Sequence, residues 1–284
     1  MNTAAKIRAD VAAIQAAHAP KVRRLEFDFS DDIPEFWYDN DAFRTVLLYA
    51  LSGGFPEGER FFIDSVRHFQ DQIKDPELKA AIRGFIGQEA HHAKSHHALN
   101  EFIERRGYPV SRIDRDVGRL MNFFRRKFSP ERQLAPTVAV EHFTALMAEQ
   151  FVLLSDELNK MDPRMAKIWA WHAIEESEHK AVAFDVFKTT VDDEWIRLSQ
   201  MVFTSFIFVT FSTLDFLRLM RHSGQMTNLR MWARGLNYFW GKPGMFRKMI
   251  PAYLDYYRRD FHPWQHDSSV LLAAVKKRYL QNEA

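Results

Sequence analysis

The sequence contains no cysteine among its 284 residues. This absence excludes disulfides, zinc–thiolate sites, iron–sulfur clusters and cysteine nucleophiles, and it is typical of a reducing compartment. Low-complexity tracts and internal repeats are also lacking, so we expect a single domain over residues 1–284. Residues 1–20 include Asp10 and have no continuous apolar stretch, so we expect no secretory signal and a cytoplasmic location.

The chain also lacks a large excess of charge of either sign, because its formal net charge is +2. This balance argues against a general nucleic-acid-binding protein. The charge is unevenly distributed, since residues 196–265 contain ten Lys or Arg and three Asp or Glu, a local charge of +7. The rest of the chain therefore carries −5, which is +2 minus +7. A basic C-terminal third on an acidic body predicts a surface that faces a particular partner.

Alternating strand patterns are scarce and helical periodicity dominates, which predicts an all-α fold. Three helix starts have the same form, a capping residue followed by proline. These starts are Asp75-Pro76, Ser129-Pro130 and Asp162-Pro163. Proline is favourable there because the first N–H of a helix has no partner within the helix.

Four long helices are predicted in the first two thirds of the chain. They cover residues 57–74, 76–106, 130–160 and 163–190, and the first follows a break at Gly53, Gly54 and Pro56. A partly helical crossover over residues 111–128 joins the two helix pairs. This order is typical of a ferritin-like four-helix bundle. We expect a bundle core over residues 41–190, extra N-terminal helices and a C-terminal helical extension over residues 191–284.

Two Glu-x-x-His pairs lie on two of the predicted helices. Glu89 and His92 form one pair and Glu176 and His179 the other, and the spacing places each pair on one helix face. Two such pairs are half of a dinuclear carboxylate site, whose other half is a single glutamate on each remaining helix.

The single glutamates are Glu59 and Glu141, each in apolar surroundings. A buried carboxylate without a partner costs several kcal/mol, so a cation is expected beside it. Two iron ions, or manganese, suit ligands of this kind. Glu57 is an alternative to Glu59, although its place before Gly58 favours a position at the helix start.

Other polar residues near these motifs are expected to support the ligands. His172 lies one turn before Glu176 on the same helix face. The residues expected to orient ligands through hydrogen bonds are Glu175, Gln88 and His96. The residues expected to be solvated, salt-bridged or turned away are His91, His97, His142, Glu149 and Glu178.

The ligand pattern resembles a known class of enzymes. The order is Glu59, Glu89-x-x-His92, Glu141, His172-x-x-x-Glu176-x-x-His179. It is similar to that of the di-iron N-oxygenases of the p-aminobenzoate N-oxygenase type, which carry an extra histidine before the last Glu-x-x-His. This resemblance implies that His172 is a seventh ligand.

A second resemblance is closer and covers residues 41–264. It rests on Phe-Pro-Glu-Gly-Glu-Arg-Phe-Phe at 55–62, Trp-His-Ala-Ile-Glu-Glu-Ser-Glu-His-Lys at 171–180 and Phe-His-Pro-Trp at 261–264. In these motifs the chain resembles a bacterial family described as predicted metal-dependent hydrolases.

Three functions remain open at this point. The main hypothesis is an oxygenase whose di-iron site activates O₂ to oxidise a small apolar substrate, with an external electron-transfer partner because the chain has no flavin or iron–sulfur motif. The first alternative is a dinuclear hydrolase that uses a metal-bound hydroxide. Seven protein ligands leave it few open positions for water and substrate. The second alternative is a metal-binding protein without enzymatic activity.

The C-terminal third contains an uncharged run over residues 198–214, which Asp215 closes. A membrane-spanning helix needs about 20 apolar residues, and this run is shorter and interrupted by serine and threonine. Two interpretations remain: a helix buried against the bundle, or peripheral membrane contact through residues 195–250. Cations and aromatic residues follow the run and suit an anionic lipid surface. A homodimer is a further assembly that the sequence allows.

Overall fold

The computed structural model describes residues 20–153 and 156–280, and these residues have an all-α fold, as predicted. The first nineteen residues, on which the predictions about a secretory signal and an N-terminal helix depend, lie outside the described ranges. The α-helices are α2 (Ala42–Arg67), α3 (Pro76–Arg105), α4 (Val110–Lys127), α5 (Pro130–Ala148), α6 (Pro163–His179), α7 (Val182–Thr190), α8 (Glu194–Met220), α9 (Leu229–Trp240), α10 (Met245–Asp255) and α11 (Ser269–Tyr279).

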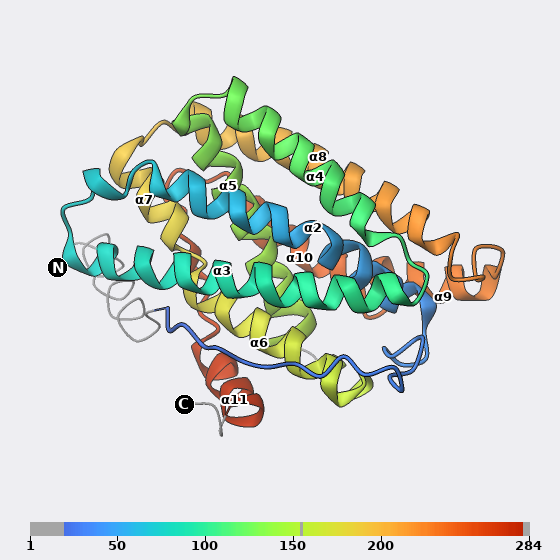
Figure 1. The fold of residues 1–284 in the computed structure, drawn as a ribbon. Helices are drawn as coiled ribbons and strands as arrows, with labels where there is room; N and C mark the ends of the chain where they lie inside the picture. The colour runs from blue at the N-terminus through green and yellow to red at the C-terminus, as the bar shows by residue number, and fades with distance from the viewer. Residues whose placement is uncertain (1–19, 154–155, 281–284) are drawn as a thin grey trace.

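The centre of the molecule is surrounded by α2, α3, α5 and α6 (Figure 1). Helix α2 packs against α3 and α5, and α6 packs against the same two helices from the other side. Helix α4 runs along α2 and connects the pair α2–α3 to the pair α5–α6, as expected for a crossover. Helix α7 continues α6 and contacts α3 and α5, while α8 lies against α5 and α2. Four helices therefore present side chains to one shared interior.

The three predicted helix starts are confirmed. Asp75 and Asp162 cap α3 and α6, and their carboxylates accept 3.0 Å hydrogen bonds from the backbone N–H groups of Glu77 and Arg164. Ser129 is the N-cap of α5 but makes no capping bond through its side chain. The sequence signal is reliable here because it depends only on local backbone geometry.

The predicted start of the first long helix was wrong. Helix α2 begins at Ala42 and continues through Pro56. The missing N–H of Pro56 frees the carbonyl of Ser52, and Asn100 on α3 donates a 3.0 Å hydrogen bond to that carbonyl. A side chain at Gly53 would come within 3.1 Å of Ile113, so this glycine allows close packing of α4 instead of breaking the helix.

Two other boundaries also differ from the prediction. The helix predicted over residues 130–160 ends at Ala148 and is followed by a π-helical turn (Glu149–Leu153) and a 3₁₀ turn (Glu157–Lys160). The helix predicted over residues 163–190 is divided between α6 and α7. At the division, the buried Lys180 donates a 2.5 Å hydrogen bond to the carbonyl of His266. Tertiary contacts of this kind outweigh local helix propensity.

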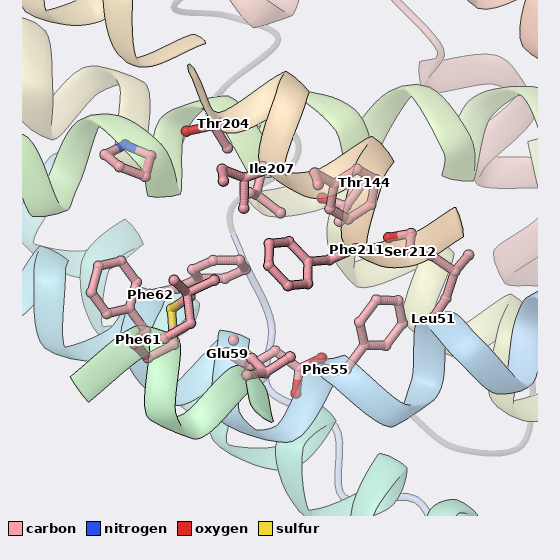
Figure 2. Close-up of a pocket in the computed structure, with 18 of the residues that line it drawn as sticks. Leu51, Phe55, Glu59, Phe61, Phe62, Thr144, Thr204, Ile207, Phe211 and Ser212 are labelled. Carbon is pink, nitrogen blue, oxygen red and sulfur yellow. The ribbon is translucent and has the colours of Figure 1, made fainter. Parts of the chain in front are cut away.

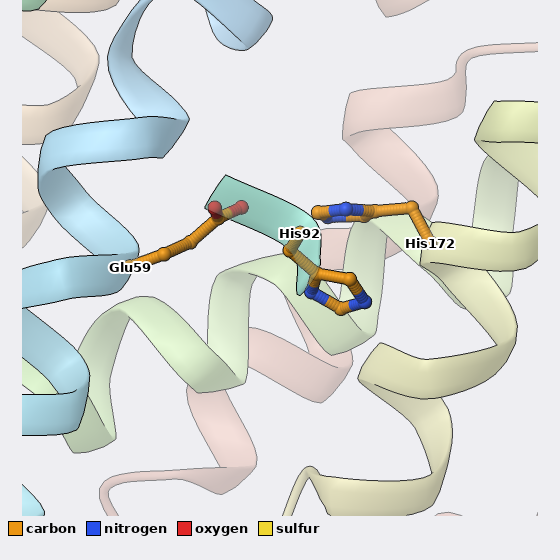
Figure 3. A group of neighbouring side chains, drawn as sticks. All are labelled: Glu59, His92 and His172. Atoms are coloured by element: carbon orange, nitrogen blue, oxygen red, sulfur yellow. The ribbon is translucent and has the colours of Figure 1, made fainter. Parts of the chain in front are cut away.

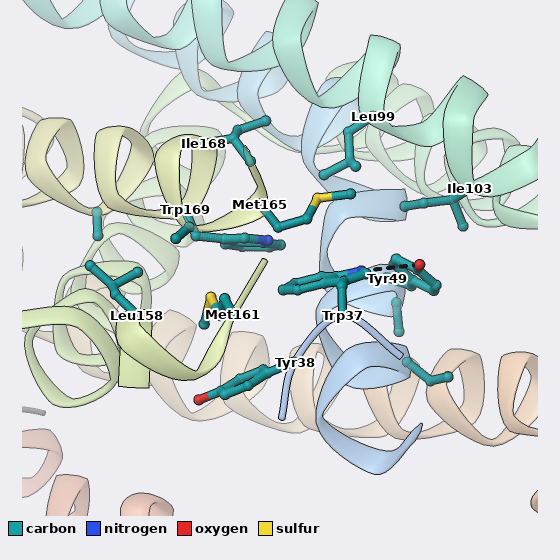
Figure 4. Packing of buried hydrophobic residues seen from close by; sticks show 14 of the residues in the cluster. Trp37, Tyr38, Tyr49, Leu99, Ile103, Leu158, Met161, Met165, Ile168 and Trp169 are labelled. Carbon is teal, nitrogen blue, oxygen red and sulfur yellow. Dashed lines mark hydrogen bonds between the residues drawn. The ribbon is translucent and has the colours of Figure 1, made fainter. Parts of the chain in front are cut away.

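Two apolar clusters fill the interior, and they occupy opposite ends of the four helices. One includes Trp37, Tyr49, Leu99 and Met165, and Figure 4 shows the 3.0 Å hydrogen bond from the Trp37 indole to the Tyr49 hydroxyl. The other includes side chains from α2, α3, α5 and α7, such as Phe61 and Phe85. On α2, α3 and α5, the glutamates and the histidine of the predicted site fall between residues of the two clusters. On α6, His172 lies among residues of the first cluster, and Glu176 and His179 follow them. The fold therefore holds one polar layer between two apolar ones.

Candidate metal centre

The structure brings all seven predicted metal ligands together in the polar layer. Three overlapping groups have donor atoms that all lie within 4.8 Å of one another. The groups are Glu59, His92 and His172; Glu89, His92 and Glu176; and Glu89, Glu141 and His179. All seven side chains are buried, and Figure 3 shows the first group, whose members point toward one another from α2, α3 and α6. Two neighbouring divalent ions could share such a set.

Glu176 is the central member of the site. Its Oε1 atom lies 3.4 Å from Nε2 of His172, 3.5 Å from Nδ1 of His92 and 3.6 Å from Nε2 of His179. On the far side, Nε2 of His179 lies 3.1 Å from Glu89. One carboxylate oxygen thus faces three imidazoles, and Glu176 would be a central ligand if metal ions were bound.

The buried oxygen atoms of the site have no hydrogen-bond partner. Both carboxylate oxygens of Glu59, Glu89 and Glu141 lack one, as does Oε2 of Glu176. Leaving a buried acceptor unsatisfied costs about 1–3 kcal/mol, and more for a charged group. Because the orphaned atoms converge on one volume, the donor set fits a pair of divalent cations with oxygen and imidazole ligands.

The ionisation of these groups shows how strongly they depend on one another. Burial, together with neighbouring carboxylates, raises the pKa of Glu59 well above its usual range and that of Glu141 to about 8. Burial and the nearby His92 lower the pKa of His172 to about 3, so this imidazole is neutral and able to bind metal. At His179, adjacent carboxylates outweigh burial and raise the pKa. Without cations, the site holds protons in their place.

Each histidine of the cluster is oriented by contact with a different residue outside the cluster. His179 turns Nε2 toward the carboxylates, and its Nδ1 lies 3.0 Å from the amide oxygen of Gln88. The amide nitrogen of Gln88 donates in turn to Glu178 at 2.8 Å. Contacts of this type fix the tautomer and orientation of a metal-binding imidazole. Gln88 therefore has the position expected from the sequence, and its supporting role remains a prediction.

His172 is held by a chain of hydrogen bonds that ends at α2. Its Nδ1 lies 3.0 Å from Nε2 of His96, and Nδ1 of His96 lies 2.9 Å from the hydroxyl of Ser52. That hydroxyl donates to the side-chain oxygen of Asn100 at 2.8 Å. If His172 offers a lone pair on Nε2 to a metal, its Nδ1–H donates to His96, and each later group donates to the next. The direction of the chain therefore matches metal binding at His172.

His92 is supported by a buried ion-pair network. Its Nε2 lies 3.2 Å from Oε2 of Glu175, while Arg23 lies 3.2 Å from the other oxygen of Glu175 and 2.7 Å from Glu178. Arg23 belongs to the segment that precedes α2, and this segment passes close to α3. A side chain at Gly84 of α3 would come within 2.5 Å of the Pro20 carbonyl, so glycine is required for this approach.

Sequence reasoning missed three residues of this supporting layer: Arg23, Ser52 and Asn100. None belongs to a motif, and the contacts of Ser52 and Asn100 depend on how α2 and α3 pack. Glu178 is salt-bridged, in agreement with one of the two expected states, but it is also buried.

The remaining polar residues near the motifs lie outside the ligand cluster. Glu57 is partly exposed and pairs with Arg60, so the structure places Glu59 rather than Glu57 in the cluster. His97 is exposed, and His142 is turned toward the carbonyl of Ala252 at 3.3 Å.

An apolar cavity of about 160 Å³ adjoins the cluster. Glu59, His172 and Glu176 form part of its wall, and aromatic and aliphatic side chains from α2, α4, α5 and α8 form most of the remainder. Figure 2 shows Glu59 and Phe55 on one side of the cavity and Phe211 of α8 facing them. No lysine or arginine of the described residues lines this cavity. The cavity is therefore suited to an apolar group that reaches one side of the metal cluster.

Comparison with known proteins agrees with the second resemblance. The family described as predicted metal-dependent hydrolases matches residues 21–267, and the chain belongs to that family. No curated protein and no solved structure gives a significant match.

Proposed function

From this family membership and the seven-donor cluster, we propose that the chain is an enzyme in which two divalent metal ions act on an apolar organic substrate. The supporting observation is that seven buried donors, four of them carboxylates, converge beside an apolar cavity and find no other partner for most of their oxygens. We also propose that residues 41–190 form a ferritin-like core and residues 191–284 an extension. The contacts among α2, α3, α5 and α6 support that assignment.

The reaction that the family description favours is hydrolysis. A bound metal pair would polarise an acyl group and lower the pKa of a water molecule. The chain itself contributes Glu59, His172 and Glu176 at the edge of the cavity, where a substrate carbonyl can approach them. Phe55, Phe211 and their neighbours make most of the cavity wall apolar. The lack of a cationic side chain in the cavity wall favours an ester or amide of a hydrophobic acid over a phosphate.

Oxidation by O₂ is the second candidate function, and the position of His172 favours it. This residue adds a third imidazole at the side of the cluster that faces the cavity, and the polar chain through His96 supports it. The resemblance to the di-iron N-oxygenases rests on the same residue. Iron, or manganese, and an external electron donor would then be required.

One set of measurements separates these functions. The protein is loaded with Zn²⁺, Mn²⁺ or, without oxygen, Fe²⁺, and its metal content is determined. Hydrolysis of p-nitrophenyl esters with acyl chains of increasing length tests the first function. Oxygen uptake and an absorption change after exposure of the Fe²⁺ protein to air test the second. A content well below two ions per chain with every metal would overturn the proposal of a dinuclear enzyme.

A further inference from the structure

Helix α8 exposes many of its large apolar side chains. It is the one helix in the described part of the chain that is long and apolar enough to cross a membrane, yet only 22% of its most apolar window is buried. Of the eight residues that it buries, four are polar or charged (Arg197, Gln200, Thr204 and Asp215) and four are apolar (Met201, Phe216, Leu219 and Met220). The large apolar residues that it exposes are Trp195, Val202, Phe203, Phe206, Val209, Phe211 and Leu214. A helix in the core of a protein would show the opposite pattern.

The exposed apolar surface continues over the two helices that follow. Leu229, Leu236 and Trp240 of α9 are exposed, as are Ile250 and Leu254 of α10. A cavity of about 500 Å³ lies between helices α8, α9 and α10 and the bundle helices α2 and α5, and it is lined almost entirely by apolar side chains. We name this surface of α8, α9 and α10 the apolar face. Contiguous apolar surface of this kind marks an interaction site.

Cations border the apolar face, and exposed acids are missing from it. Residues 194–255, which span α8 to α10, contain eight Lys or Arg and three acids, a net charge of +5. Asp215 is buried, and the partly exposed Glu194 and Asp255 lie at the two ends of the range, where they pair with Arg197 and Arg258. The exposed cations are Arg221, Arg230, Arg234, Lys242, Arg247 and Lys248. None of these six has an acidic partner within residues 20–153 and 156–280. The face therefore combines apolar area with positive charge that is not neutralised.

We propose that the apolar face binds the surface of a membrane that contains anionic lipids. Apolar side chains would enter the interface, and the bordering cations would contact lipid headgroups. A second copy of the chain is a poorer occupant, because a two-fold contact would bring like charges together without an exposed acid to balance them.

A spanning arrangement of α8 also fits poorly. Arg197 is 1% exposed and donates hydrogen bonds to the backbone carbonyls of Tyr256 and Arg258, at 2.5 Å and 3.0 Å. These bonds anchor α8 to the C-terminal part of the chain. A helix that crossed a bilayer would have to give up these contacts and place Arg197 in lipid.

The position of the apolar face connects docking to the proposed function, although the docking argument does not depend on it. The 500 Å³ cavity and the cavity at the metal cluster share the side chains of Leu51, Phe208 and Ser212. An apolar chain leaving a bilayer would thus meet two adjoining apolar cavities before it reached the ligands. The inferred substrate class is an amphiphile with a lipid-like chain.

Sedimentation with liposomes tests the docking itself. The full chain is mixed with vesicles of phosphatidylcholine alone and with vesicles that contain phosphatidylglycerol, each at low and high salt. We expect binding to the anionic vesicles at low salt and weaker binding at high salt, because salt screens the headgroup contacts. Protein that stays in the supernatant in all four conditions would overturn the proposal.

Paired variants keep the test specific. Arg230→Glu with Arg234→Glu should lower the partition coefficient by at least about 30-fold, which is the loss expected from the two missing cations alone. The matched control is Lys79→Glu with Arg83→Glu, which reverses two exposed cations four residues apart on α3 and should leave binding unchanged. Phe206→Glu should also weaken binding, whereas Val270→Glu, at an exposed apolar position on α11, should not.

Two results would contradict the proposal even if the wild-type protein sediments. If the control variant Lys79→Glu with Arg83→Glu loses as much vesicle binding as Arg230→Glu with Arg234→Glu, net charge alone drives binding. A dimer in light scattering that Phe206→Glu converts to a monomer, together with no difference between the variants on vesicles, would assign the apolar face to contact between copies.

Discussion

The metal cluster and the apolar face place side chains in opposite ways. The metal cluster buries four glutamates and three histidines, whereas α8 exposes phenylalanine and valine. Both placements are unfavourable for a chain alone in water. A buried charge loses its favourable hydration, and an exposed apolar side chain stays in unfavourable contact with water. They differ in the partner that we propose to remove this cost: cations in the interior and lipid at the surface. The contribution of the metal cluster to the free energy of unfolding should therefore depend on metal and pH. The contribution of the apolar face should depend on neither.

The largest effect is expected for the central carboxylate. Glu176→Ala removes the oxygen that faces all three histidine ligands, so we expect metal content to fall from about two ions per chain to near zero. The helices should still form, because the remaining carboxylates can take up protons. Elemental analysis and circular dichroism measure the two outcomes. A variant that retains both ions would contradict the central position of Glu176.

The ion-pair network behind His92 should make the next largest contribution. Arg23→Ala leaves Glu175 without its cation, while Glu178 keeps Lys276 at 2.6 Å. Breaking a buried pair in this way should cost about 3 kcal/mol of unfolding free energy. Urea denaturation measures the loss. Arg24→Ala, at the adjacent exposed position, is the control and should change stability by less than about 0.5 kcal/mol.

Orientation of His172 provides a smaller, functional test. His96→Ala should weaken metal binding about 10- to 100-fold, which is typical for a residue that orients a ligand. His96→Gln should recover part of this loss, since its amide oxygen can accept the proton of His172. Titration with Mn²⁺ gives the affinities, and the exposed neighbour His97 supplies the control variant His97→Ala. Equal affinities for the wild type and His96→Ala would remove His96 from the site.

The dependence on pH distinguishes the interior from the surface directly. Burial raises the pKa of Glu141 to about 8, so in the metal-free protein its stabilising protonated form is complete below about pH 4.5 and is lost as the pH rises toward about 8. Metal replaces protons, so its affinity should increase over the same range. The difference in melting temperature between metal-loaded and chelator-treated protein should thus grow from pH 6 to pH 8. A constant difference would indicate that the carboxylates are already ionised at pH 6.

The smallest effect is expected on the apolar face. Phe206→Ser should change the unfolding free energy by less than about 0.5 kcal/mol, because the side chain is 67% exposed. Phe61→Ser, at a position that is 2% exposed, should cost about 3 kcal/mol or more. Thermal denaturation of the two variants, with and without chelator, compares them. A large loss at Phe206 would show that the face is covered by another part of the chain.

Local signals in the sequence predicted much of the fold. The capped starts at Asp75 and Asp162 were correct because a cap depends on its own turn of helix. The interruption predicted at Pro56 was wrong, because the compensating donor, Asn100, lies on another helix. The same long-range contact places Ser52 beside His96, which no spacing rule could have indicated.

The sequence by itself determined that the chain is helical, and helix periodicity alone places Glu89 with His92 and Glu176 with His179 on shared helix faces. The assignment of seven metal ligands stays a prediction, and that of His172 came from the resemblance. Only the tertiary structure decided that these donors meet, that Arg23, Ser52 and Asn100 contact the cluster or its neighbours, and that α8 leaves many of its large apolar side chains exposed. Each of these outcomes depends on contacts between segments far apart in the chain. A pattern read along one helix specifies a face, and only packing decides what that face meets.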